Sequence, residues 1–541
     1  ASFELRPNKY HLYFDLMEWD MTNYTMNFSQ FSEDQAWLVS VDQFQDSLSF
    51  YATEAQYDLV THDLDVNGVG EILMPPVTIL PDSSRVHILS NGKMKQLNNA
   101  RISVHSDTKT EYNFYKTKLD VLNGGEFVGS GWFDYSNSEG HTQPIYFSQL
   151  KKQGDDVFGI AYLKEEDDFH LDQHFGYKGK VILDSSKDFL NFNGDTRIHQ
   201  ACNALNRAWI PFNDEVNPDD VFINLNPEIR LTDRQQWHAG VMLSQKPTVC
   251  YPAFLSSPKR VNDYEIMGVN GFVHFDDMNR HYVIGSEEKI ENPNLPGNLA
   301  IYNPEACTLY SEGAINLGEN TGLVNVGGQG WLISSIDEQT INGVVDLSFD
   351  FLMHKKAAKL IRKALKKASF GEVVDQSNEL HQRMLSDQLG SKQLRKYNRK
   401  KQKGKRFLPD AFKHTFYFPQ LSLIWNSKTT SFISNYEIPL NNIIGRKIDR
   451  MVPGIIEIRP RGLGDEINIY IHLSKENYYY FSYRRGVMNI ISSNQEFNQL
   501  ILNSPRRLSN RKGTPDTGPF KYQLGNVRQM QKFLRRMMWE E

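Results

Sequence analysis

The sequence is poor in cysteine, with only Cys202, Cys250 and Cys307 in 541 residues. Their spacing fits no zinc-binding or thioredoxin-like pattern, so neither of those sites is predicted. One disulfide with one spare thiol and three free thiols are both compatible with this count, which leaves the compartment open. The sequence also lacks a run of about eighteen apolar residues, so we expect no membrane-spanning helix.

Catalytic motifs are lacking as well. There is no His-Glu-x-x-His, no Gly-x-Ser-x-Gly, no phosphate loop ending in Gly-Lys-Ser/Thr and no dinucleotide fingerprint that opens a helix. The stretch DLDVNG, from Asp63 to Gly68, matches the start of a calcium loop. Met74 stands where that loop needs a bidentate glutamate, and we interpret the stretch as a strand. We therefore predict a non-enzymatic protein with no catalytic residue, no metal site and no cofactor.

Strand patterns dominate the first 350 residues. In five segments a glycine precedes alternating residues, and the second and fourth positions after it are apolar, which places them on one face of a strand. These segments are GWFDY from Gly131, GKVIL from Gly179, GFVHF from Gly271, GAINL from Gly313 and GVVDLSF from Gly343. We expect each glycine at a strand entry, where it relieves a tight turn or a bulge.

A longer similarity links YDLVTHDLDV, from Tyr57 to Val66, with YNFYKTKLDV, from Tyr112 to Val121, at an offset of 55 residues. Repeated strand units whose apolar faces stack can build a continuous core. The sequence therefore predicts a mainly β fold of elongated, repeated strand units, in which Tyr57 and Tyr112 occupy equivalent places.

Positive charge is scarce in the first 350 residues, which hold 24 Lys and Arg against 50 Asp and Glu, and abundant in the rest, with 36 against 15. Such asymmetry indicates an anionic partner for the basic part. Attraction between the two parts of the chain would explain it equally well.

A basic helical pair is predicted after Phe351. In MHKKAAKLIRKALKKA the apolar residues from Met353 to Ala368 form a helical stripe, and lysines and Arg362 crowd the opposite face. The helix either packs on the preceding sheet, the interpretation we favour because its stripe has no Trp or Phe, or lies on an anionic membrane surface. A second helix is expected from about Glu372 to Leu389, ended by Gly390 and Ser391.

The stretch RKYNRKKQKGKRFLPD, residues 395–410, follows these helices. We interpret it as an exposed, solvated connector, because dense like charge repels itself and resists folding. Nucleic-acid binding is disfavoured, because Tyr397 is the only aromatic residue before Phe407.

The sequence predicts six regions. They are a β-repeat region (1–125), a second β-rich region (126–350), the helical pair (351–394), the connector (395–408), a C-terminal β module (409–500) and a tail with a short amphipathic helix (501–541). The apolar residues of the tail helix are expected to dock on a partner or a neighbouring domain. The candidate partner-binding residues are Lys355, Lys359, Arg362, Lys366, Lys400, Lys401, Lys403, Lys405, Phe533 and Met537.

The stretch DSLSFYATEAQYDLVTHDLDVNGVGEIL resembles the repeating strand units of OstA-type, lipopolysaccharide-transport-like β domains. NNARISVHSDTKTEYNFYKTKLDV and YYYFSYRRGVMNIISSNQEFN are similar to large cell-envelope proteins of Bacteroidota, as is the richness in Asn, Phe and Tyr. The resemblance implies an exported protein at the outer membrane, in the periplasm or associated with that membrane. Because the sequence begins with ASFELRPNKY, without an initiator Met, we expect a mature product or a part of a longer one.

The predicted function is therefore that of an envelope scaffold or assembly component in an outer-membrane or secretion-associated complex. Its expected partners are other envelope proteins and an anionic surface or lipid. A conduit for lipid or lipopolysaccharide is one alternative, and it needs an exposed apolar trough. A glycan-binding protein or glycan-cleaving enzyme is the other, and the enzyme needs two carboxylates about 5 to 10 Å apart in a cleft.

Overall fold

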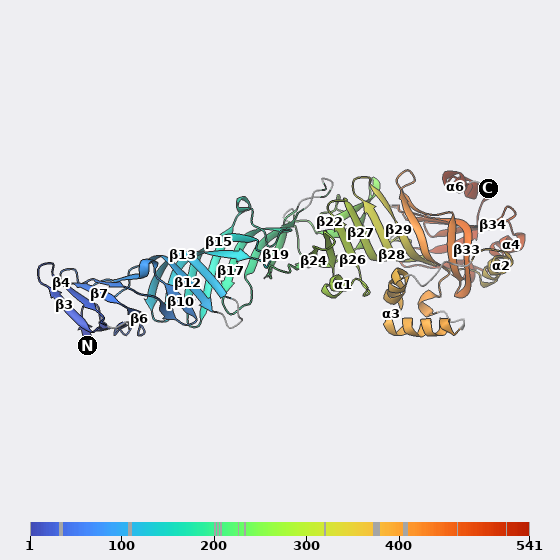
Figure 1. The fold of residues 1–541 in the computed structure, drawn as a ribbon. Coiled ribbons are helices and arrows are strands. Elements are labelled where there is room, and N and C mark those ends of the chain that lie inside the picture. The colour runs from blue at the N-terminus through green and yellow to red at the C-terminus, as the bar shows by residue number, and fades with distance from the viewer. Residues whose placement is uncertain are drawn as a thin grey trace. The chain divides into compact units, whose positions relative to one another are not determined.

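The fold was analysed in a computed structural model. It describes residues 2–31, 36–105, 111–199, 202, 205, 208–225, 227–231, 234–318, 321–371, 379–403, 409–461, 464–515 and 517–539. The chain forms two compact units, Ala1–His199 with Trp209–Ile223 and Gln200–Ala208 with Asn224–Glu541. With 53% strand and 13% helix, the structure confirms the predicted mainly β fold (Figure 1).

In its described residues the first unit consists of strands and two short 3-10 helices. The strands are β1 (Phe3–Leu5), β2 (Tyr10–Tyr13), β3 (Leu16–Asp20), β4 (Thr25–Ser29), β5 (Ala36–Ser40), β6 (Ser49–Ala52), β7 (Glu54–Asp58), β8 (Leu64–Asn67), β9 (Ile72–Met74), β10 (Val77–Leu80), β11 (Arg85–Ile88), β12 (Leu97–His105), β13 (Glu111–Asn123), β14 (Glu126–Ser136), β15 (Thr142–Gln153), β16 (Asp156–Leu163), β17 (Phe175–Asp184), β18 (Asn191–Ile198) and β19 (Ile210–Glu215). The 3-10 helices are η1 (Asp82–Ser84) and η2 (Glu165–Asp167).

These strands form a four-stranded sheet (β1-β2-β5-β6), a five-stranded sheet (β11-β8-β7-β4-β3) and a ten-stranded sheet (β19 to β12 in succession, then β10 and β9) in the described part of the chain. The large sheet is an antiparallel meander whose neighbours follow one another along the chain. Its apolar face is packed with aromatic side chains, and the rings of Phe114 and Phe147 lie 5.6 Å apart, edge to face. Such aromatic pairs across strands stabilise a sheet beyond the apolar area that they bury.

The ten-stranded sheet crosses the expected boundary at residue 125. Asn123 pairs with Glu126, so Gly124 and Gly125 form a two-residue turn between β13 and β14 of one sheet. The predicted boundary after residue 125 thus falls on a turn inside one sheet.

The predicted repeat is wrong. Tyr57 lies on β7 and pairs with Leu64 of β8 across a turn, whereas Tyr112 and Leu119 lie on the single strand β13. The Leu-Asp-Val segments do share one feature, because Leu and Val are buried and Asp is exposed in both. The similarity therefore reflects strand alternation and not equivalent units.

All five glycine-led segments are strands, as predicted. Only Gly271 stands at a strand entry, while the other four glycines lie inside their strands. At Gly343 an added Cβ would lie 2.0 Å from the carbonyl oxygen of Trp331 on the neighbouring strand. The glycine is needed there for close approach of two backbones and not for a turn.

The second unit holds further strands and the described α-helices. The strands are β20 (Ile223–Leu225), β21 (His238–Gln245), β22 (Thr248–Ser256), β23 (Tyr264–Gly268), β24 (Gly271–Asp276), β25 (His281–Gly285), β26 (Leu299–Asn303), β27 (Thr308–Ile315), β28 (Asn325–Ser335), β29 (Thr340–Asp350), β30 (Phe416–Asn426), β31 (Ser431–Ser434), β32 (Glu437–Ile443), β33 (Arg446–Arg459), β34 (Glu466–Ser474), β35 (Asn477–Arg484), β36 (Val487–Ser492), β37 (Asn510–Arg511) and β38 (Phe520–Leu524). The helices are α1 (Glu287–Glu291), α2 (Lys355–Lys367), α3 (Glu379–Gln402), η3 (Asp410–Phe412), α4 (Gln495–Leu502), α5 (Arg506–Ser509) and α6 (Val527–Arg536).

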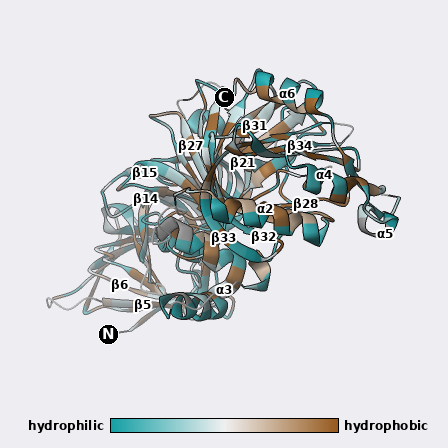
Figure 2. Ribbon diagram, turned by 90° about the vertical axis from the view of Figure 1, so that its right-hand side faces the viewer, coloured by the Kyte–Doolittle hydropathy of each residue, from teal (hydrophilic) through white to brown (hydrophobic). Residues whose placement is uncertain are grey.

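A sixteen-stranded sheet organises the described part of this unit, beside a small sheet of β22, β21 and β23. The large sheet closes on itself locally, because β30 pairs with β31 and β32, and both of these pair with β33. Alternate residues of β33 to β36 face two different cores. One core holds α2 and α4, and the other holds α6 (Figure 2).

The expected separation of residues 126–350 from a module starting at residue 409 is not found. Phe349 of β29 pairs with Phe416 of β30, so strands before and after the helices belong to one sheet. The helices are thus an insertion between two neighbouring strands. Apolar alternation locates strands but does not say which strands pair, and this boundary was missed for that reason.

Candidate functional site

Helix α2 presents lysines to solvent because its apolar stripe is anchored in the core. Ala357, Ala358, Ile361 and Leu365 are fully buried, and the helix packs against α4 and β33. The packing interpretation of this helix is therefore confirmed. Its apolar face is not available to enter a lipid bilayer.

His354 caps the N-terminus of α2. Its Nδ1 accepts a hydrogen bond from the backbone N–H of Lys356 at 3.2 Å. Burial, and to a lesser extent the charge of Lys356, lowers the pKa of His354, which favours the neutral ring that can accept this bond. The cap fixes where the helix begins and hence which side chains face outward.

The exposed face of α2 carries a cluster of positive charges. Lys355, Lys356, Lys359, Lys363, Lys366 and Lys367 are exposed. Within the described residues none of them forms a salt bridge, and the helix itself contains no acidic residue. Arg362 differs, because it is half-buried and its Nη1 donates to the carbonyl oxygen of Ile443 at 3.2 Å.

The β32–β33 hairpin lies beside α2 and beside the segment that precedes β30. Ile443 pairs with Arg446 across the turn, and Arg446 is exposed. Burial, and to a lesser extent the nearby charge of Arg446, lowers the pKa of Arg362. On the other side of the turn, the Gly445 N–H donates to the His414 carbonyl oxygen at 3.1 Å.

Helix α3 consists of two helical halves that meet at Gly390, whose φ is +68° and ψ is 155° (Figure 1). The expected helix end at this glycine is a bend, after which the chain continues as helix to Gln402. Residues 395–402 of the predicted connector are therefore helical. Residues 404–408, which include Lys405, lie outside the described part.

The first half of α3 is anchored by buried charges. Lys289 Nζ lies 2.5 Å from Glu312 Oε1, and both side chains are nearly inaccessible to solvent. Arg383 of α3 donates from Nη1 to the Pro293 carbonyl oxygen at 2.7 Å and has Nη2 3.5 Å from Glu312 Oε2. Asp387 accepts a bond from the Gly297 N–H at 3.0 Å.

The second half of α3 is held by aromatic contacts and carries cations outward. The Tyr397 ring lies 6.0 Å from that of Phe412, and Leu394 packs on the same cluster. Burial, and to a lesser extent the charges of Asp449 and Asp346, raises the pKa of Tyr397. The predicted exposure of the stretch thus holds for Arg395, Lys396, Arg399 and Lys403, but not for Tyr397 and Lys400, which are half-buried.

We call the exposed cations of these three elements the basic surface. Its members are Lys355, Lys356, Lys359, Lys363, Lys366, Lys367, Lys392, Arg395, Arg399, Lys403 and Arg446. Among the described residues none of them takes part in a salt bridge. This arrangement can bind phosphate or carboxylate groups.

The predicted residues fall partly on this surface. Lys355, Lys359, Lys366 and Lys403 belong to it, Arg362 borders it, and Lys400 is half-buried. The Lys401 side chain lies outside the described part. Sequence reasoning missed Arg446, because only the pairing of β32 with β33 brings that hairpin to α2.

Phe533 and Met537 pack against other residues of the same chain. Both are buried, with Met530 and Leu534, against Ile455, Tyr470 and other residues of the sheet. Met538, another apolar residue of the expected docking face, is 79% exposed. The sheet of the same unit is thus the surface on which the tail helix docks.

Asp63 and Asp65 of the calcium-like stretch flank one imidazole. His87 Nδ1 lies 2.6 Å from Asp65 Oδ1, and His87 Nε2 lies 3.5 Å from Asp63 Oδ2. In the described residues no group of three or more His, Cys, Asp or Glu side chains is arranged to hold a metal ion. No described helix is both long and apolar enough to cross a membrane.

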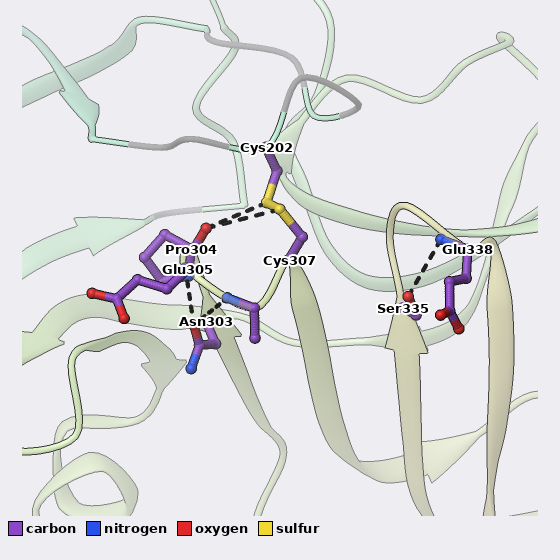
Figure 3. Close-up of a disulfide and its surroundings, with 8 residues drawn as sticks. Cys202, Asn303, Pro304, Glu305, Cys307, Ser335 and Glu338 are labelled. Atoms are coloured by element: carbon purple, nitrogen blue, oxygen red, sulfur yellow. Dashed lines mark hydrogen bonds between the residues drawn. A yellow bond between two sulfur atoms is a disulfide. The ribbon is translucent and has the colours of Figure 1, made fainter.

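Cys202 and Cys307 form a disulfide within the second unit, with their Cα atoms 5.7 Å apart (Figure 3). Cys250 is free and buried, and burial raises the pKa of its thiol. Of the two cysteine states left open by the sequence, the structure has one disulfide and one thiol. Comparison of the sequence with known protein families and with curated proteins finds no match in either.

Proposed function

We propose that the protein is a non-enzymatic scaffold of the cell envelope, and that its second unit attaches to an anionic lipid surface through the basic surface. One observation carries this proposal. Eleven exposed cations of α2, α3 and the β32–β33 hairpin have no salt-bridge partner among the described residues. Each basic residue near an anionic membrane contributes about 1 kcal/mol to its binding.

The spacing of the lysines of α2 destabilises the helix that carries them. Lys355, Lys359, Lys363 and Lys367 follow one another at i, i+4 spacing. Each like-charge pair at this spacing destabilises a helix by roughly 0.2–0.5 kcal/mol. Lys355 also stands in the first turn, where the helix dipole disfavours a cation. An anionic surface would relieve this repulsion.

An extracytoplasmic place is supported by the disulfide, because such bonds persist in oxidising compartments. It agrees with the resemblance of the sequence to envelope proteins with OstA-type units. Partner proteins of the envelope would bind elsewhere on the chain. This setting also favours lipid over nucleic acid as the anionic partner.

The filled sheet faces favour a scaffold over a lipid conduit. Ile79, Ile102, Phe147 and Phe192 of the ten-stranded sheet are each at most 1% exposed. A conduit would need such residues along an open trough. In the described part of this sheet they form a packed core.

Co-sedimentation with vesicles tests the proposal. The whole chain should bind vesicles of phosphatidylglycerol and phosphatidylethanolamine and not vesicles of phosphatidylcholine, and the binding should weaken as salt is raised. Replacing Lys355, Lys359, Lys363 and Lys366 with Gln should weaken it roughly 100-fold or more.

The matched control replaces four exposed lysines elsewhere in the second unit, namely Lys475, Lys512, Lys521 and Lys532, with Gln. This variant loses the same charge and should keep most of the binding. Equal losses in the two variants would show a general charge effect. Preference for duplex DNA over vesicles at the same salt concentration would make the partner a nucleic acid and overturn the proposal.

A further inference from the structure

The first unit contains a pocket of about 650 Å³ that the basic surface does not involve. Its walls come from β12, β13 and β14, from the loop after β17 and from the loop after β19. The Tyr112 hydroxyl donates to the carbonyl oxygens of Lys187 and Asp188, each at 3.4 Å. These bonds hold the first loop over the strands, so the pocket is a built feature of the fold.

Aromatic rings form the apolar part of the pocket. Phe133 is half-buried between Tyr112 and Phe114, with ring centroids 5.8 and 5.7 Å away. Phe189, from the loop after β17, is 37% exposed. The pocket therefore offers aromatic surface that is held in place by packing and still accessible to a ligand.

Carboxylates gather around this aromatic surface. Glu111, Asp134, Asp188 and Asp219 line the pocket, against Arg101 as its one lining cation among the described residues. Burial raises the pKa of Tyr112 to about 12, and the charges of Asp188, Glu215 and Asp184 add to this rise. The surroundings of the Tyr112 hydroxyl are therefore negatively charged.

From this geometry we propose that the pocket binds an organic cation, an ammonium or guanidinium group on an apolar stem. The cation would face the carboxylates while its stem and charge contact the rings of Phe133 and Phe189. Cation–π attraction and charge pairing then act on the same ligand, and a cleft focuses the field of its charges. An anionic ligand would be repelled by these carboxylates, and a purely apolar ligand would make no use of them.

Two sources could supply such a group, a free polyamine or the lysine and arginine side chains of a basic protein segment. Both ligands present the charged group that the pocket would bind. They differ in how many contacts they would make outside the pocket. Neither requires the second unit to bind lipid, so this inference stands apart from the proposed function.

Calorimetric titration of the whole chain with spermidine and with hexalysine tests the inference. Both should bind, and raised salt should weaken both. Replacing Asp134 and Asp188 together with Asn should weaken binding about tenfold or more, because the side-chain shape is kept and only charge is lost. Phe189→Ala should weaken it about threefold.

The control replaces Glu18 and Glu71 with Gln, which removes two exposed carboxylates of the same unit away from the pocket. It should change the affinity less than twofold if the pocket, and not net charge, determines binding. Unchanged melting curves will show that all variants are folded. If hexalysine binds more tightly than its added charge explains, the source is a protein segment. If hexalysine and spermidine bind with similar affinity, the source is a small polyamine.

The alternative of a glycan site is tested by the same titration with a neutral saccharide, the trimer of N-acetylglucosamine. Its binding, with no binding of spermidine or hexalysine, would make the pocket a glycan site and overturn the inference. The inference is equally wrong if the Asp134→Asn, Asp188→Asn variant binds the cations as tightly as the control does.

Discussion

Glu457 shows how a single buried charge ties the C-terminal helix to the second unit. Its side chain is fully buried on β33, where Oε1 accepts a bond from Ser431 at 3.0 Å and Oε2 accepts one from Asn468 at 2.9 Å. Arg536, at the end of α6, donates to Oε2 at 2.6 Å. A buried carboxylate depends on such partners, because an unpaired charge in the interior is costly.

We expect Arg536→Met to destabilise the second unit by roughly 3 kcal/mol, because it leaves the Glu457 carboxylate without its cation. Urea unfolding at neutral pH measures this loss. The double variant with Glu457→Gln should recover part of it, since no charge is then left unpaired. A single variant that unfolds at the same urea concentration as the unchanged chain would contradict the role of this ion pair.

Residues of the candidate surface were predictable to the extent that they lie on a helix. The lysines of α2 could be placed on an exposed face because its apolar stripe fixes the opposite face. Arg446 could not, because its position depends on which strands pair. The same limit applies to Phe533 and Met537, whose apolar character showed a docking face but not the sheet that covers it.

At the scale of elements, the lysines of α2 are expected to lower the stability of their helix and to promote binding to anionic vesicles. Lys359 lies four residues from both Lys355 and Lys363, so Lys359→Glu replaces two repulsive pairs with two attractive ones. We expect the second unit to become more stable by roughly 0.5–1 kcal/mol while binding to anionic vesicles weakens. Thermal unfolding and co-sedimentation on the same preparation measure both effects. A variant that loses stability would show that the lysines serve the fold.

The bend of α3 depends on Gly390. A side chain at its φ of +68° and ψ of 155° is strained although no atom lies within 4 Å of the added Cβ, so the cost is conformational. We expect Gly390→Ala to cost about 1–3 kcal/mol and to release the second half of the helix. Trypsin should then cut faster at Arg395 and Arg399. Ser391→Ala is the control, and equal cleavage rates in the two variants would contradict this account.

Element types were easier to predict than element partners. The five glycine-led segments are all strands because alternation of apolar residues is a local signal. The supposed repeat of Tyr57 and Tyr112 failed because the same alternation suits both a hairpin and one continuous strand. The charge of the basic stretch after Gly390 predicts irregular structure. Leu394 and Tyr397 supply the apolar contacts that hold it as a helix.

At the scale of the whole molecule, charge is divided between the two units. The first unit holds 16 Lys and Arg against 34 Asp and Glu, and the second holds 44 against 31. The sequence showed an acidic part up to residue 350 and a basic part after it, but that change of charge lies inside the second unit. The structure locates the division between the units at an acidic, aromatic pocket in one unit and at the basic surface in the other.

The disulfide should stabilise only the second unit, because both cysteines belong to it. The bond closes a loop with a sequence separation of 105 residues. Closing a loop of that size restricts the unfolded chain by up to about 4–5 kcal/mol.

Calorimetry with and without a reductant should therefore show a lower melting temperature for the second unit alone. The Cys202→Ser, Cys307→Ser variant should behave like the reduced protein in either condition. Unchanged melting of the second unit after full reduction would contradict a stabilising role for the bond.

The central claim, that the second unit meets an anionic lipid surface through α2, α3 and the β32–β33 hairpin, is tested most directly by lysine footprinting. An amine-reactive label is applied to the whole chain with and without phosphatidylglycerol vesicles, and each lysine is followed by mass spectrometry. The account predicts that Lys355, Lys359, Lys363, Lys366 and Lys392 lose reactivity on binding, while the exposed Lys475 and Lys532 keep theirs. Protection of Lys475 and Lys532 with continued labelling of the α2 lysines would contradict it.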